Sequence, residues 1–144
     1  MARIVLLLAL SHVLLFSGCS SLMHPKAEEF YTQAKGATGQ QTALALLAMM
    51  EVSAQQAKAE VGESLGLDNL HNQFYALHKT FCEFTKQQFA TTAFEQAYTL
   101  NKELKTIFHR LWKFKNDTSL RAIHLDLFLA RIHELRSVIQ AIPG

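Results

Sequence analysis

Histidine and cysteine are the residue types through which this chain could do chemistry. His78 and Cys82 are four residues apart, a spacing that puts two side chains on one side of a helix, where they can share a metal ion. His71 lies two turns before His78 on the same side. The sequence fixes no further acidic, histidine or cysteine ligand nearby, so we expect a polar seam beside an apolar stripe rather than a metal centre.

A haem held between helices is a second possibility, because it needs only two axial ligands and leaves little trace in a sequence. Met50 and His133 would lie at the same level of an antiparallel bundle, an arrangement that loosely resembles the small periplasmic four-helix cytochromes. A methionine on an apolar stripe is more often a core residue. The chain contains no di-iron, c-type haem, Gly-x-Ser-x-Gly or Gly-rich phosphate-loop motif, and we expect neither a cofactor nor an enzyme.

The other cysteine, Cys19, ends an apolar leader. Arg3 gives the leader a positive start, and residues 4–16 form an apolar run of the length found in secretory signals. This run is shorter than the roughly 20 apolar residues that a permanent membrane span needs. The small residues Ser17 and Gly18 directly precede Cys19. The leader therefore predicts export and cleavage.

Residues 15–19, which read LFSGC, resemble the lipobox of bacterial lipoproteins, with Phe16 where that class usually has leucine. The resemblance implies cleavage before Cys19 and acylation of Cys19 by diacylglycerol and palmitate, which together make a stable membrane anchor. Ser20 implies sorting to the outer membrane in the Gram-negative version of the class, facing the periplasm or the cell surface. The alternative is an ordinary secretory signal followed by a chance cysteine.

Cys82 is the only cysteine besides Cys19. If Cys19 carries lipid, the chain offers Cys82 no cysteine with which to form a disulfide. Cys82 lies among aromatic residues, and we expect a buried, unreactive thiol.

Helices must position these residues, because the chain has only 6 Gly and 2 Pro, and both prolines lie near the ends of the mature chain. A break near Ala90 is expected, with one continuous helix over 68–114 as the alternative. Asp68 is the expected N-cap of one helix, and Thr92 with Glu95 the expected capping box of the next. The expected helices are 25–35, 40–63, 68–90, 92–114 and 119–141.

Each long helix carries an apolar stripe at steps of three and four residues. Short connections make neighbouring helices antiparallel, so the sequence predicts an all-α, antiparallel up-and-down four-helix bundle with a short extra N-terminal helix. The expected divisions are a signal peptide over 1–18, a lipidated tether with a short helix over 19–39, and a bundle domain over 40–144. The stripes comprise Leu47, Met50, Ala54, Ala57 and Val61; Leu70, Phe74, Leu77, Phe81 and Phe84; Ala97, Leu100, Leu104, Ile107, Leu111 and Phe114; and Leu125, Phe128, Ile132, Leu135, Ile139 and Ile142.

The aromatic content, with 10 Phe, 3 Tyr and 1 Trp, is high for a small bundle and indicates either a wide core or a patch for a partner. Charge is also uneven, since residues 20–100 hold five basic and eight acidic residues and residues 101–144 hold eight and four. A basic and aromatic cluster near the end of the third long helix is the candidate partner-binding patch. Its residues are Phe108, Arg110, Leu111, Trp112, Lys113, Phe114 and Lys115.

The features together favour a non-enzymatic, lipid-anchored bundle that binds another envelope protein, as an assembly factor, pilotin-like escort or adaptor. The alternative is a carrier that holds haem, metal or a hydrophobic molecule between its helices. Export makes nucleic acid an improbable partner.

Overall fold

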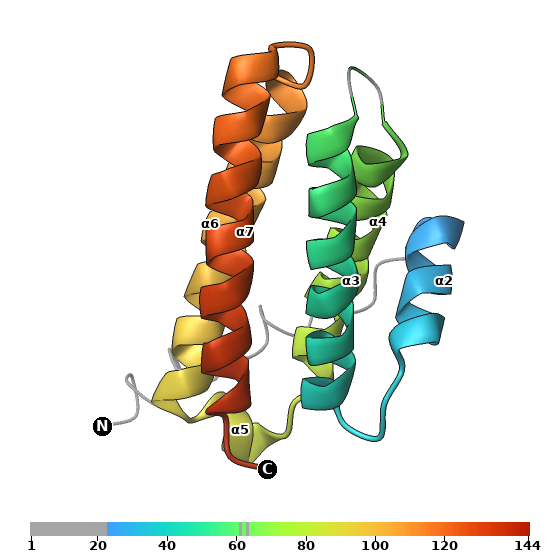
Figure 1. Ribbon diagram of the computed structural model, residues 1–144. Helices are drawn as coiled ribbons and strands as arrows, with labels where there is room; N and C mark the ends of the chain where they lie inside the picture. Colours follow the sequence, from blue (N-terminus) through green and yellow to red (C-terminus); the bar gives the residue numbers. More distant parts are fainter. Residues whose placement is uncertain (1–22, 61, 63) are drawn as a thin grey trace, which may run out of the picture.

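The computed structural model describes residues 23–60, 62 and 64–144, and every regular element in this part of the chain is helical (Figure 1). The expectation of an all-α chain is therefore confirmed for these residues. None of their helices combines the length and apolar character that crossing a membrane requires. The elements are α2 (Pro25–Ala34), α3 (Gly39–Ala59), α4 (Leu65–Thr80), the 3₁₀ turn η1 (Phe81–Glu83), α5 (Lys86–Phe89), α6 (Thr92–Lys113) and α7 (Thr118–Gln140).

Side-chain caps set the helix starts, and two of them differ from those expected. Ser64, not Asp68, caps α4, because Ser64 has an extended backbone and its hydroxyl accepts a hydrogen bond from the N–H of Leu67 at 3.1 Å. Asp68 instead lies in the first turn of α4. Thr91, not Thr92, caps α6, and its hydroxyl accepts from the N–H of Phe94 at 3.2 Å.

The break between α4 and α6 is longer than expected and excludes one continuous helix over 68–114. Helix α4 ends at Thr80, and Phe84 has the extended φ and ψ of −69° and 150°. A capping box does occur here, but at Thr85 and Gln88, where it starts the short helix α5. The side chain of Gln88 also donates to the carbonyl of Pro143 at 2.9 Å, which ties this connection to the end of the chain.

The core contains the expected apolar stripes. The complete stripes of α4 with its following turn and of α7 are buried, as are Leu47, Met50, Ala54 and Ala57 on α3. On α6, Ile107 and Phe114 are only half-buried, and Val61 lies outside the described residues. All the apolar side chains that are buried in the described part of the chain lie between Ala27 and Ile142.

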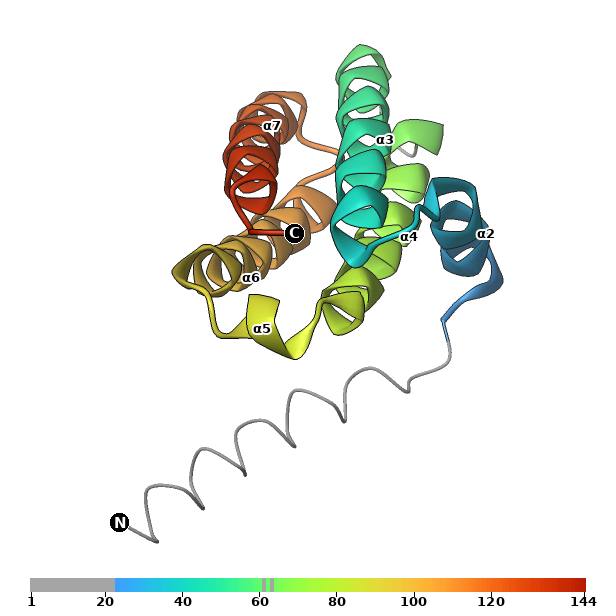
Figure 2. The same ribbon diagram turned by 90° about the horizontal axis from the view of Figure 1, so that it is seen from below.

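Helix α3 lies between α4 and α7 (Figure 2). It runs antiparallel to α7, because the side chain of Gln40 donates to the carbonyl of Ile139 at 2.7 Å at one end and Lys58 Nζ lies 2.6 Å from Asp126 Oδ1 toward the other. Against α4 it packs closely at Gly66. A Cβ at that glycine would lie 2.6 Å from the nitrogen of Ala57, so the approach requires glycine.

Helices α4 and α6 meet through aromatic rings. Phe74 stacks on Phe108 with ring centroids 6.1 Å apart, and further along, Phe81 meets Tyr98 edge-on at the same separation. Residue numbers rise along α4 as they fall along α6, so these two helices are also antiparallel. The rings occupy the space between these two backbones, whereas at Gly66 the backbones of α3 and α4 approach each other directly.

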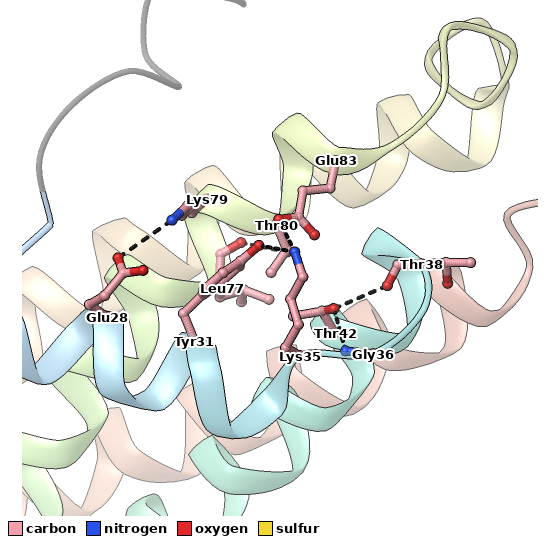
Figure 3. Close-up of polar contacts among 10 residues, drawn as sticks. All are labelled: Glu28, Tyr31, Lys35, Gly36, Thr38, Thr42, Leu77, Lys79, Thr80 and Glu83. Carbon is pink, nitrogen blue, oxygen red and sulfur yellow. Dashed lines mark hydrogen bonds and ion pairs between the residues drawn. The ribbon is translucent and has the colours of Figure 1, made fainter.

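Helix α2 packs against α4 and α3 and buries Ala27, Tyr31 and Ala34. Figure 3 shows Tyr31 and Lys35 facing the end of α4 and the turn that follows it. Its observed bounds match the short helix expected over 25–35. Lys35 Nζ donates to the hydroxyl of Tyr31 at 2.6 Å and to Glu83 Oε1 at 3.0 Å, which links the end of α2 to the turn after α4. The N-terminal helix is thus part of the folded body.

Arg121 of α7 holds the connection between α3 and α4 although it is a buried cation, with 4% of its surface exposed. Its guanidinium donates to the carbonyls of Ala57 at 2.6 Å, Gly62 at 2.5 Å and Lys115 at 3.3 Å. Ala57 is in the last turn of α3, where carbonyls have no partner within the helix. Arg121 therefore satisfies acceptors that burial would otherwise leave without hydrogen bonds.

Replacing this cation tests its contribution to stability. Arg121→Met should lower the free energy of unfolding by about 3 kcal/mol, because buried carbonyls lose a charged donor. The matched control is Arg131→Met, whose exposed side chain pairs with Glu103 and Glu134 and whose loss should cost under about 1 kcal/mol. Urea unfolding followed by far-UV circular dichroism measures both. Equal losses would show that the carbonyls of the connection do not depend on Arg121.

Candidate functional site

The three residues considered as metal ligands do not form a metal site. His71 is half-buried on α4, His78 is exposed one turn from its end, and Cys82 lies in the turn that follows. Within the described residues, no group of three or more His, Cys, Asp or Glu side chains could hold a metal ion. His78 is exposed beside the phenylalanine stripe, whereas His71 lies among aromatic rings.

Cys82 corrects a sequence expectation. It is half-buried rather than buried, and it is disulfide-bonded rather than a thiol. Cys19 is the other cysteine of the sequence and lies, with the whole lipobox, outside the described residues. A disulfide within the chain and a thioether-linked lipid both need the sulfur of Cys19. These two fates of Cys19 therefore exclude each other chemically.

Met50 and His133, the pair considered as haem ligands, lie at the same level of α3 and α7, but their side chains do not point toward a common site. Met50 is fully buried on α3, whereas the side chain of His133 on α7 is 56% exposed and its Nε2 lies 3.6 Å from Glu51 Oε1. His133 of α7 thus lies beside Glu51, the residue that follows Met50 on α3. The two potential ligands point to different environments, the core and the surface, and together they do not form a haem site.

The structure divides the candidate partner-binding patch. Phe108 and Leu111 are buried in the core and cannot contact a partner, which corrects their inclusion in the patch. A helix that is apolar over a wide arc buries the part of that arc that lies between its neighbours. Phe108 and Leu111 occupy this buried part of α6.

The remaining patch residues lie on two sides of α6. Trp112 is 40% exposed and, with Lys115, lines a hollow on the side of α4. Phe114 stacks on the ring of His124 of α7, with centroids 5.7 Å apart, and Lys113 Nζ lies 5.3 Å from the Phe114 ring. Arg110 is exposed.

Two neighbouring hollows run along the junction of α4 and α6. The larger, of about 400 Å³, is open and is lined at the start of α4 by Leu65 and Asp68, near the end of α6 by Trp112, and just beyond α6 by Lys115. The smaller, of about 80 Å³, has aromatic and basic walls. We refer to the surface around both as the α4–α6 face, which comprises Leu65, His71, Tyr75, His78, Lys105, His109, Trp112 and Lys115.

His71 lies at the centre of this face among aromatic rings. Its imidazole stacks on Phe108 at 5.4 Å with the planes 1° apart, lies 5.4 Å from Trp112, and meets Tyr75 edge-on at 5.1 Å. Lys115 Nζ lies 4.3 Å from the centroid of the Trp112 ring, a cation–π distance. The face thus combines a rigid aromatic surface with nitrogen bases.

Burial and neighbouring positive charge shift the histidines of this face. Loss of hydration lowers the pKa of His71, with smaller lowering by His24 and His109 that Asp68 opposes. Burial also lowers the pKa of His78, and the positive charge of Lys105 adds to this effect. Both pKa shifts favour the neutral imidazole.

Sequence reasoning did not connect Lys105 and His109 of α6 with His71 and His78 of α4. All four residues line the smaller hollow. The signal that could have found them is the antiparallel register of the two helices, which brings residues far apart in the sequence to the same level.

No protein-family model, no curated protein and no solved structure matches this chain.

The histidine shifts predict how stability depends on pH. Because the folded-state pKa values of His71 and His78 lie below those of the unfolded chain, the unfolded chain binds more protons as the pH falls through the ordinary histidine pKa, and stability falls with it. The free energy of unfolding should therefore decrease between about pH 7.5 and about pH 5.5.

A double variant, His71→Gln with His78→Gln, should show a smaller decrease than the unmodified chain, because the other titrating groups are common to both proteins. Urea unfolding at the two pH values measures the difference. An identical decrease in both proteins would contradict the assignment to these two histidines.

Proposed function

We propose that the protein is a lipid-anchored helical bundle that faces the periplasm from the outer membrane and binds another envelope protein, as an assembly factor, pilotin-like escort or adaptor. The anchor is an acylated Cys19 at the start of the mature chain. The support for this part is the apolar leader and the LFSGC stretch, in which the small residues before the cysteine suit signal-peptide cleavage at that position.

The proposal includes a particular use of Cys19. Lipidation accounts for the small residues directly before Cys19 and for the apolar run that precedes them, whereas a disulfide with Cys82 would require neither feature. We therefore propose that the sulfur of Cys19 carries lipid in the exported protein, in place of the disulfide that the structure gives Cys82.

The proposed architecture is an antiparallel up-and-down bundle of α3, α4, α6 and α7, with α2 as an extra helix on its side. The opposite directions of α3 and α7, and of α4 and α6, support this arrangement. The short connections after α3 and α6 support it further, because they make each helix antiparallel to the next.

The observation that carries partner binding is an apolar stripe on the outside of α7. Ile123 and Leu127 are one turn apart, and they are 54% and 48% exposed. Arg110 and Lys113 are exposed in the last turn of α6, which connects to the start of α7. Large apolar side chains beside positive charge suit contact with another protein, since apolar area provides affinity and charge provides orientation.

The anchor predicts the behaviour of a single variant. Cys19→Ser should abolish labelling by radioactive palmitate and release the protein from membranes, because no other residue in the lipobox can form the thioether. Labelling and fractionation of cells that express the two forms make the measurement, and Cys82→Ser is the matched control that should remain labelled. Persistent labelling of Cys19→Ser would exclude the lipobox interpretation.

The α7 stripe predicts a loss of partner binding. Changing Ile123→Glu together with Leu127→Glu should reduce recovery of the partner after mild crosslinking in cells by at least about tenfold, because charge enters an apolar contact. Val52→Glu is the control, since Val52 is 68% exposed and lies on another helix, α3. Quantitative mass spectrometry of the crosslinked neighbours measures recovery. An equal loss in both variants, or no specific partner for the unmodified protein, would contradict the proposal.

A further inference from the structure

We propose that the segment that binds the α7 stripe is an acidic amphipathic helix of the partner protein, and that its carboxylates pair with Arg110 and Lys113 of α6. This inference rests on the proposed function and names the chemistry of its partner. It concerns the line along which α6 and α7 lie side by side (Figure 2).

Two contacts between α6 and α7 fix the ends of this line. At one end Arg131 Nε lies 3.1 Å from Glu103 Oε2, and at the other the ring of Phe114 stacks on that of His124. Between positions 103 and 114 a helix rises by about 16 Å, at about 1.5 Å per residue. A partner helix of about three turns therefore matches the length between the two contacts.

Helical spacing places exposed residues between these contacts. Arg110 precedes Phe114 by four residues, and Leu127 follows His124 by three. Residues three or four apart share one side of a helix, so Arg110 lies on the α7 side of α6 and Leu127 on the α6 side of α7. Their neighbours one turn away extend this surface. We call it the α6–α7 seam, which comprises Arg110, Lys113, Ile123 and Leu127.

The apolar side chains of the seam suit a helix of another protein. Ile123 and Leu127 are exposed and one turn apart, a spacing at which one helix packs its apolar residues against another. Both are aliphatic. The exposed Tyr75 and Trp112, whose types are enriched at membrane surfaces, line the hollows beside α4 instead. The seam therefore favours a protein over a bilayer surface.

The two cations of the seam have no acid to neutralise them. Arg110 and Lys113 are exposed in the last turn of α6. Across the part of the chain that the structure describes, neither side chain forms an ion pair, and the contact of Lys113 Nζ is with the ring of Phe114.

The carboxylates of this part of the hairpin are engaged elsewhere. Glu103 pairs with Arg131, Asp126 pairs with Lys58, and Asp117 caps the start of α7. These three acids thus leave the charge of Arg110 unmatched, so a partner must supply the carboxylate.

An acidic amphipathic helix meets both requirements of the seam. A guanidinium binds a carboxylate through two parallel hydrogen bonds, and an ammonium beside it accepts a second acid of the same helix turn. Apolar residues three or four apart on the same helix cover the α7 stripe. Opposite charges at the edge of an apolar contact orient the partner and exclude basic competitors.

A photoreactive residue at position 130 of the full-length protein tests this in cells. Ala130 is exposed and follows Leu127 by three residues, so the probe lies beside the seam and leaves the α7 stripe intact. Mass spectrometry of the crosslinked peptides identifies the segment of the partner. We expect a segment with apolar residues three or four apart and Asp or Glu beside them.

Charge reversal tests the pairing itself. Arg110→Glu with Lys113→Glu should lower the crosslink yield at least about tenfold, because like charges then meet. The matched control, Lys86→Glu with Lys105→Glu, makes the same change in net charge on α5 and at the hollow beside α4, and should keep the yield within about twofold. Far-UV circular dichroism checks that each variant is folded.

Rescue provides the strictest readout. Changing the acidic residues of the crosslinked segment to lysine should restore the yield with Arg110→Glu and Lys113→Glu and lower it with the unmodified protein. Crosslinks to lipid, to a second copy of this chain or to a segment without acidic residues would overturn the proposal. An equal loss in both double variants would also overturn it, since only net charge would then matter.

The proposed function can stand when this inference fails. Loss of the partner with Ile123→Glu and Leu127→Glu, but not with Arg110→Glu and Lys113→Glu, would keep binding of an envelope protein and exclude an acidic segment. Absence of a specific protein crosslink from the unmodified seam, together with no specific partner after mild crosslinking, would contradict both.

Discussion

The close approach of α3 and α4 is the constraint on which the shape of the molecule depends. At Gly66 a Cβ would lie 2.6 Å from the nitrogen of Ala57 and 2.7 Å from the carbonyl oxygen of Ser53, so this position of α4 can carry only glycine. Toward α6, Phe74 of α4 meets Phe108. The hollows of the α4–α6 face lie beside these rings.

Charged residues are arranged differently on the side of α3 and α7 and on the side of α4 and α6. On the side of α3 and α7, carboxylates are matched by bases across the two helices, as in the pair of Glu51 with Arg136 at 2.6 Å. That guanidinium lowers the pKa of Glu51 through a hydrogen bond and its charge. The bases that line the hollows of the α4–α6 face include Lys105 and Lys115.

Much of the fold follows from local pattern in the sequence. The stripe from Leu125 to Ile142 is buried because a period near 3.6 residues places its members on one face, whatever the neighbouring helix is. Cap positions were less predictable. Asp68 and Ser64 both have side chains that can cap a helix, and the choice between them depends on which backbone is extended.

Which residues of the candidate site are exposed depends on contacts between helices, and the apolar periodicity of the sequence does not reveal these contacts. The sequence grouped Phe108, Leu111 and Trp112 because all lie on one apolar arc of a helix, but only the packing of α4 and α7 against that arc determines which of them stays exposed. The disulfide of Cys82 was missed for another reason. The small residues before Cys19 indicate a lipidated cysteine, and a lipidated Cys19 cannot also form a disulfide.

Mass spectrometry of the N-terminal peptide, from protein extracted from membranes without reducing agent, tests the lipid anchor most directly. The account predicts a peptide that begins at Cys19 and carries thioether-linked diacylglycerol. A peptide in which Cys19 is joined to Cys82 by a disulfide and carries no lipid would contradict it.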